Sequence, residues 1–273
     1  MSFDIREVAR WLGKPVELYR FTRQDLNWRY ASGDQSIVVA DETFEPLAIS
    51  RESLKESYER QKRNLKITIP IGAEVAQNWQ PFPPGDTITV TVMAMHRGDG
   101  ELVVQWTGRV IQPRYTDTSL ELTCAPGIGS NRPRGVQLRF QRSCTVALYS
   151  QGVGMCNLAP ADFAAAGVLD DVDGNIVSAS AWASLPDGRL AGGFIEWTST
   201  NGLLQRRSIT AHGGAQLHLH YGASDLEPGL AVTAYHGCAH NFGDCDSKGN
   251  GVNYGGCANL PQKNPFSGDP IWW

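Results

Sequence analysis

The residues of this chain best suited to chemistry are cysteines, and five of the six lie in two turn-rich stretches. The first stretch, CTVALYSQGVGMC, begins at Cys144 and ends at Cys156. The second is the Gly-, Asn- and Asp-rich run 235–273, and its cysteines are Cys238, Cys245 and Cys257. This run has too few aliphatic residues to offset the entropy lost on ordering, so hydrophobic packing alone does not hold it. A metal centre, a disulfide clip or a tail with incidental cysteines would each account for the pattern.

The expected compartment favours the metal explanation over the disulfide. The first residues lack the continuous apolar run of a secretory signal, and no stretch of about 18 apolar residues occurs. We therefore expect synthesis in the cytosol, no export by the Sec route and no stable membrane insertion. In a reducing compartment, cysteines serve as free thiols or metal ligands more often than as disulfides.

Two loops that each supply two thiolates suit tetrahedral zinc or an iron–sulfur cluster, because both accept four cysteine ligands. The candidate ligands are Cys144, Cys156, Cys238 and Cys245. Eleven residues separate the first pair and six separate the second. Paired ligands of structural zinc usually have about two to four residues between them, so the spacing slightly disfavours zinc.

The remaining candidates have plainer interpretations. Cys124, in the strand-like LELTCAP, is predicted to be a small buried hydrophobic residue, and Cys257 is predicted not to be a ligand. His236 and His240 flank Cys238 and are alternative nitrogen ligands, but we expect polar loop residues beside the centre. The alternating pair in AQLHLHYG, His218 and His220, is typical of a solvated strand face.

Other function classes have less support. A hydrolase would use Cys238 as nucleophile with a neighbouring histidine as base, but no orienting group or oxyanion-bearing helix start is apparent. A redox enzyme would need a readable partner or cofactor site, and no P-loop, GxGxxG, GxSxG or HExxH motif occurs. A zinc-stabilised carbohydrate-binding module is the other alternative, with stacking candidates Trp106, Trp182, Trp197, Trp272 and Trp273. We expect a protein that is not an enzyme.

Composition predicts a mainly β protein in two parts. With 29 glycines and 15 prolines in 273 residues, the chain suits turn-rich β structure, and a net charge of −4 gives no basic footprint for sequence-specific nucleic-acid binding. The Gly/Pro/Asn/Ser run 125–135 reads as a linker. We predict a first small β-barrel domain over 1–135, a second over 136–235, and an irregular cysteine-rich segment over 236–273.

The apolar spacing predicts a short helix over residues 2–12 and then a meander of short antiparallel strands. The stretch 49–70 is predicted to form two long strands joined by a charged turn, although its middle contains good helix formers. Residues 158–168, LAPADFAAAGV, read as a short helical excursion in the second block. Strands are expected again from NIVSASAWASL at residue 175 to LAVTAYHGC.

Several motifs resemble phage proteins. The run GCAHNFGDC, followed by NGVNYGG and LPQKNP, is similar to the end of phage minor tail proteins of the lambda L type and their BR-family relatives. Upstream, RSCTVALYSQGVGMC and GGFIEWTSTNG resemble further parts of that family, and LYRF, FEPLAISR and LKITIP are similar to its strand order. The resemblance implies a tail tip hub in the virion of a long-tailed phage (siphophage), assembled in the bacterial cytoplasm.

The resemblance also implies a cofactor and partners. Carried over residue by residue, the family's ligands to a [4Fe–4S] cluster fall on Cys144, Cys156, Cys238 and Cys245. The sequence GMC here replaces the commoner Gly-Cys-Gly, and Cys257 stands where the family more often has an aromatic or aliphatic residue. The implied assembly is a homotrimer of paired β-barrel hub domains that meets the distal tail protein, the central tip or fibre protein and the tape measure protein.

Overall fold

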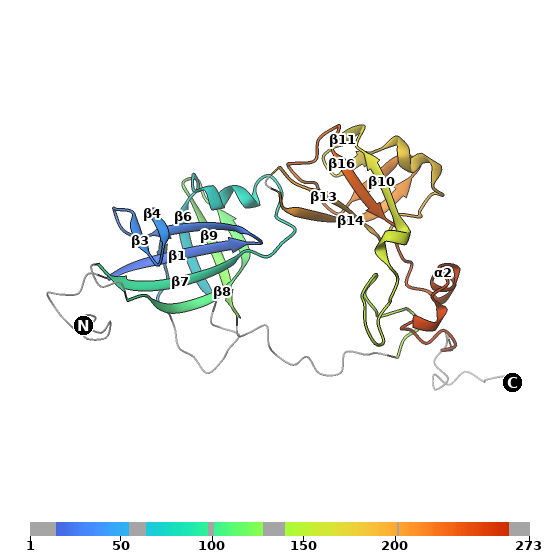
Figure 1. Ribbon diagram of the computed structural model, residues 1–273, viewed down its shortest axis with the longest axis horizontal. Helices are drawn as coiled ribbons and strands as arrows, with labels where there is room; N and C mark the ends of the chain where they lie inside the picture. Colours follow the sequence, from blue (N-terminus) through green and yellow to red (C-terminus); the bar gives the residue numbers. More distant parts are fainter. Residues whose placement is uncertain (1–14, 55–63, 98–100, 128–139, 201, 262–273) are drawn as a thin grey trace. The chain divides into compact units, whose positions relative to one another are not determined.

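The computed structural model describes residues 15–54, 64–97, 101–127, 140–200 and 202–261 (Figure 1). The chain divides into two compact units, Met1–Pro133 and Arg134–Trp273. The regular secondary structure of the described residues is mainly strand, which confirms the mainly β prediction. No helix in these ranges is long and apolar enough to cross a membrane.

The first unit is a nine-stranded sheet that curls around its core as a half-barrel (Figure 1). Its strand order is β3-β4-β2-β1-β7-β8-β9-β6-β5. The strands are β1 (Pro15–Arg23), β2 (Leu26–Ala31), β3 (Ile37–Val39), β4 (Glu42–Pro46), β5 (Ser50–Arg51), β6 (Leu65–Pro70), β7 (Thr89–His96), β8 (Val103–Tyr115) and β9 (Ser119–Pro126). Alternation places one face inside: in β6, Leu65, Ile67 and Ile69 are buried while Lys66 is exposed. A 3₁₀ turn over Glu74–Trp79 adds Val75 to this core.

The second unit is a seven-stranded sheet in the order β10-β16-β13-β14-β15-β12-β11. Its strands are β10 (Ala164–Val168), β11 (Asp171–Asp173), β12 (Ile176–Ser178), β13 (Phe194–Thr198), β14 (Leu204–Gly213), β15 (Gln216–Leu219) and β16 (Ala231–Tyr235). Trp182, at 0% exposure, packs in the centre of the core with Leu217 and Ile195. The Trp182 indole donates a hydrogen bond to the Ala165 carbonyl at 3.3 Å, which holds the edge strand β10 against this core.

Three sequence predictions need correction. In 49–70 the first strand is only the two-residue β5, although β6 forms as predicted and the turn lies outside the described residues. The helix expected over 158–168 is a 3₁₀ turn at Pro160–Phe163 followed by strand β10, because pairing with β16 outweighs the helical preference of alanine. The strand expected from residue 175 ends at β12 and gives way to a 3₁₀ turn over Ser180–Ser184. The helix predicted over 2–12 also lies outside the described residues.

Candidate metal centre

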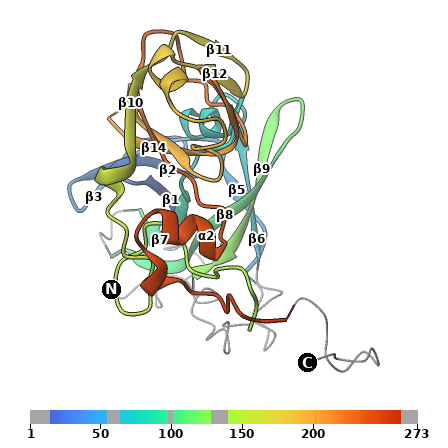
Figure 2. The same ribbon diagram turned by 90° about the vertical axis from the view of Figure 1, so that its right-hand side faces the viewer.

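The candidate centre is built from two segments of the second unit that are about a hundred residues apart in sequence. One is the loop 140–157 before the sheet, and the other is the run 236–257 that follows β16. In Figures 1 and 2 the yellow-green loop lies beside the orange-red run. Backbone hydrogen bonds join them, from Cys144 N to the His240 carbonyl and from Cys257 N to the Gln141 carbonyl, both at 2.8 Å. The Thr145 hydroxyl also donates to the Gly255 carbonyl at 3.2 Å.

An aromatic group anchors the loop 140–157 to the sheet. Tyr149 is 8% exposed, and its ring lies about 6 Å from those of Phe163, Phe194 and Tyr235. Its hydroxyl donates to the His236 carbonyl at 2.7 Å, so one side chain contacts both the sheet and the start of the C-terminal run. Burial raises the pKa of Tyr149 well above its ordinary value, which keeps the hydroxyl protonated as a donor.

Glycines let the chain cross itself immediately before Cys238. A Cβ on Gly237 would lie 1.7 Å from the Ala191 carbonyl oxygen, and one on Gly193 would lie 2.0 Å from the Tyr235 carbonyl oxygen. Real side chains do not approach backbone so closely, so only glycine fits at either position. The Gly237 amide donates to the Arg189 carbonyl at 3.0 Å, and this bond fixes the direction in which the chain leaves β16.

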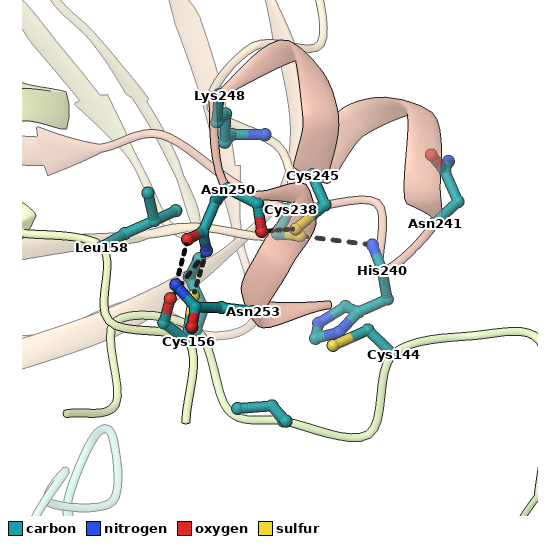
Figure 3. A pocket seen from close by; sticks show the side chains of 12 residues that line it. Cys144, Cys156, Leu158, Cys238, His240, Asn241, Cys245, Lys248, Asn250 and Asn253 are labelled. Carbon is teal, nitrogen blue, oxygen red and sulfur yellow. Dashed lines mark hydrogen bonds between the residues drawn. The ribbon is translucent and has the colours of Figure 1, made fainter. Parts of the chain in front are cut away.

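Four sulfurs line one cavity between the two segments. Figure 3 shows two of the labelled cysteines on the yellow-green loop and two on the C-terminal run. They are Cys144, Cys156, Cys238 and Cys245, the four that the sequence predicted. The apolar part of the wall is Val146, Leu148 and Leu158. The cavity encloses about 360 Å³ of unfilled space, part of which is open to solvent.

The electrostatics show that the thiols are close to one another. Burial raises the pKa of Cys245, and the negative charges of Cys238, Cys144 and Cys156 raise it further. Yet no three Cys, His, Asp or Glu side chains in the described ranges converge tightly enough to hold a single metal ion.

A short helix places Cys245, which the sequence had assigned to an irregular segment. Helix α2 (Phe242–Ser247) begins after Asn241, whose side-chain oxygen accepts a hydrogen bond from the Asp244 amide at 2.8 Å. This N-cap starts a helix that glycine and aspartate would not favour by propensity. Cys245 is 7% exposed and its thiol donates to the Asn250 carbonyl at 3.2 Å.

A buried asparagine joins the two segments on the Cys156 side of the cavity. Asn250 is 6% exposed, and its amide nitrogen donates to the Cys156 carbonyl at 2.6 Å. Its side-chain oxygen accepts a bond from the Asn253 amide at 2.7 Å. The sequence gave no signal for this role, because an asparagine in a polar loop looks solvated. A 3₁₀ turn over Gly251–Asn253 carries the second asparagine into place.

One charged pair, a buried lysine and a partly exposed aspartate, lies beside the cavity. The Lys248 side chain is 2% exposed, lines the cavity, and lies 2.6 Å from Asp244 through its Nζ atom. Burial alone would raise the pKa of Asp244, but hydrogen bonds from Lys248 and from the Ala239 amide outweigh it and lower the pKa. Asp244 is therefore a carboxylate at neutral pH and the pair is ionic. Sequence reasoning missed Lys248.

The other candidates lie elsewhere or differ in environment. Cys257 and His236 are not among the residues that line the cavity, whereas His240 is. Cys124 is fully buried in the core of the first unit, and burial raises the pKa of its thiol to about 12. In strand β15 and just after it, His218 is half-buried and His220 exposed.

Cys238 does not have the surroundings of an activated nucleophile. Burial raises the pKa of Cys238, and the nearby carboxylate of Asp244 raises it as well, whereas a nucleophilic cysteine needs a lowered pKa. The Nδ1 atoms of His236 and His240 are buried without a hydrogen-bond partner among the described residues, so no hydrogen bond at Nδ1 orients either imidazole as a base.

The tryptophans proposed for carbohydrate stacking serve the cores instead. Trp182 and Trp197 are 0% and 3% exposed, and Trp106 packs against the core of the first unit. Trp272 and Trp273 lie outside the described residues.

Comparisons with known proteins point to phages and phage-like particles. Residues 188–264, which include Cys238 and Cys245, match the family described as phage conserved hypothetical protein BR0599. An uncharacterized protein of Xylella fastidiosa (strain 9a5c) is 40% identical over 172 residues. That match covers 59% of this chain, and this chain spans only 36% of the relative's length.

A solved structure shares the fold of the whole chain. A chain in the virion of a native gene transfer agent particle superimposes with a TM-score of 0.78, over 99% of this chain and 96% of that one. Sequence identity is 15%, so the likeness is one of fold. It extends through both β units and includes the segments that carry the four cysteines.

Proposed function

We propose that this protein is a structural component of a phage-type virion, a tail tip hub that closes the tail tube and links it to the central tip or fibre. The observation that carries the proposal is the fold, which matches that of a virion chain along nearly its entire length. The phage family match over residues 188–264 supports it independently.

The second part of the proposal concerns the cavity, which we assign to a [4Fe–4S] cluster held by Cys144, Cys156, Cys238 and Cys245. Four thiols, with no carboxylate among the lining residues, match the ligands that such clusters take. A zinc ion binds sulfur at about 2.3 Å and draws its ligands nearly into contact. Paired ligands of structural zinc usually have about two to four residues between them, whereas eleven and six residues separate the two pairs here, which also favours a cluster.

When bound, the cluster supplies four iron–sulfur bonds between the two segments. The protein's own residues have already brought these segments together, through the Tyr149 anchor, the crossing at Gly237 and the hydrogen bonds of Asn250. The buried residues of the run 236–257 are Gly237, the ligand Cys245 and the polar Asn250. Because that run has almost no core of its own, the binding free energy of the cluster becomes folding free energy for it.

The proposed assembly follows from the hub role. We infer a homotrimer whose two β units give a sixfold-like ring, which contacts the distal tail protein, the tape measure protein and the central tip or fibre protein. Its place is the tail tip of the virion, after assembly in the bacterial cytoplasm.

A visible spectrum of the anaerobically purified full chain, with iron and sulfide analysis, tests the cluster. We expect a brown protein with about four irons per chain, and loss of the colour in Cys238→Ser/Cys245→Ser. Cys124→Ala and Cys257→Ser are matched controls, because one thiol is in the other unit and the other does not line the cavity; both should stay brown. A colourless wild-type protein that contains zinc would contradict the assignment.

Particle assembly and size in solution test the hub. In a particle-producing strain that carries the gene, Cys238→Ser/Cys245→Ser should give particles without complete tail tips, and the purified chain should sediment as a trimer. Normal infectious particles from the double variant would refute a structural role for the centre. Two results together would refute the hub role: a purified chain that stays monomeric, and complete particles that do not contain the protein.

A further inference from the structure

Lys248 is a buried lysine, which is rare in proteins unless the charge is paired. Its side chain is 2% exposed, and its Nζ atom lies 2.6 Å from Asp244. The pair spans one turn at the end of α2, four residues apart. Burying such a pair seldom stabilises a protein more than apolar residues would, so stability alone does not explain it.

The position of the ammonium relative to the sulfurs suggests the explanation. Among the twelve described residues that line the cavity, Lys248 is the only one with a permanent charge. In Figure 3 it extends from the same stretch of chain as Cys245. The cavity therefore has a fixed cation beside its sulfurs.

The partner carboxylate is held by the backbone. Asp244 Oδ2 accepts a hydrogen bond from the Ala239 amide at 2.8 Å, while Oδ1 meets the lysine. An ammonium carries three N–H donors, so it can contact this oxygen and still act on the sulfurs. Asp244 fixes where the lysine points, and its negative charge partly offsets the lysine's field.

We infer that Lys248 is the charge-compensating residue of the centre and that Asp244 positions it, an inference that rests on the proposed cluster. Four thiolates around a cluster core leave a net negative charge in a poorly solvated site, and one-electron reduction makes that charge larger. A nearby cation stabilises the more negative, reduced form, so Lys248 raises the reduction potential of the centre. Asp244 acts in the opposite sense.

The test is a reductive titration of the full-length protein with dithionite, followed by visible absorption and electron paramagnetic resonance. We expect Lys248→Met to shift the equilibrium tenfold or more toward the oxidised form, which is a fall of about 59 mV for a one-electron couple. Asp244→Asn should move the potential upward. Lys248→Arg, which keeps the charge, should stay near the wild type.

Two further variants separate charge from packing. Lys248→Met/Asp244→Asn removes one charge of each sign, so its potential should return toward that of the wild type. Lys66→Met breaks the exposed Lys66–Glu52 pair of the first unit, 3.8 Å apart, and should change nothing. A purely structural ion pair predicts instead that both single variants lose the cluster or shift in the same direction.

The outcomes distinguish this inference from the proposed function. A wild-type protein without a cluster overturns both. If the wild-type protein has a cluster but Lys248→Met leaves the reduction potential unchanged, the inference is overturned and the cluster assignment stands. The same holds if Lys248→Met and Asp244→Asn shift the potential in the same direction. If Lys248→Met does not fold, the other two single variants decide the question. The inference then requires a higher reduction potential in Asp244→Asn and an unchanged one in Lys248→Arg, and any other result overturns it.

Discussion

The crossing of the chain at Gly237 gives the most direct test of how the candidate centre is positioned. In Gly237→Ala the new methyl group would lie 1.7 Å from the Ala191 carbonyl oxygen and 2.8 Å from the Gly193 nitrogen. Ordinary carbon–oxygen contacts are no closer than about 3.3 Å. Both obstacles are backbone atoms, so no side chain can rotate away, and the two segments must separate by about 1.5 Å.

The cost follows from what that separation breaks. The Gly237 amide would lose its 3.0 Å bond to the Arg189 carbonyl, worth about 1 kcal/mol net. Forcing an extra methyl group into a packed site typically costs a further 1–3 kcal/mol. We therefore expect the second unit to lose about 3 kcal/mol of unfolding free energy. At a urea dependence of about 1–3 kcal/mol per molar, its midpoint should fall by roughly 1–3 M.

The assay is urea unfolding of the full chain, followed by circular dichroism and by the fluorescence of the buried Trp182 and Trp197 in the second unit. Gly213→Ala is the matched control, because a Cβ there meets nothing within 4 Å in strand β14. Replacing a strand glycine by alanine should leave the midpoint unchanged or raise it slightly. If Gly237→Ala unfolds at the same urea concentration as Gly213→Ala, the chain crossing does not constrain the centre as described.

Two other changes test the charges and the polar network. A hydrogen bond from Arg29 and the positive charges of Arg20 and Arg29 lower the pKa of Glu42, against the opposing effect of burial. The ionised form of Glu42 therefore stabilises the fold above the ordinary carboxyl range, and that contribution is lost as pH falls through the lowered pKa. Glu42→Gln should thus cost about 0.5–1 kcal/mol at pH 7 and progressively less as pH falls below the ordinary carboxyl range, as thermal unfolding at pH 7 and at a series of lower pH values will show. Asn250→Ala removes the buried donor to the Cys156 carbonyl and should lower the free energy of unfolding in urea by about 2 kcal/mol. The control Asn27→Ala, at an exposed position, should lower it by less than about 0.5 kcal/mol. Equal losses in the two variants would contradict the proposed hydrogen-bond network.

Strands with strict alternation could be predicted from the sequence, because side-chain period alone decides which face is buried. Residues 65–70 are the clearest case, with Leu65 and Ile67 inside and Lys66 outside. The strand Ala164–Val168 could not, because its three alanines favour a helix. Pairing with β16, and the close fit of Gly167 against the Trp182 ring, override that preference.

At the candidate centre, the residue types pointed to the four sulfurs, which do line one cavity. The supporting residues could not be found in the same way. Lys248 and Asn250 are polar residues in a polar run, and sequence gives no sign that such residues are buried. Their burial arises from contacts with residues about a hundred positions earlier, which local patterns do not encode.

The long separation between the two halves of the centre has a consequence for biosynthesis. Gln141 and Cys144 are held by backbone bonds to Cys257 and His240, so the loop that carries Cys144 cannot close until the ribosome has made the later run. Contacts so distant in sequence form late, because the intervening chain must first be ordered. The strands of the second unit lie between the two segments in sequence, and they can pair while the thiols are still apart. The sheet of the second unit can therefore form while Cys144 and Cys156 are still accessible.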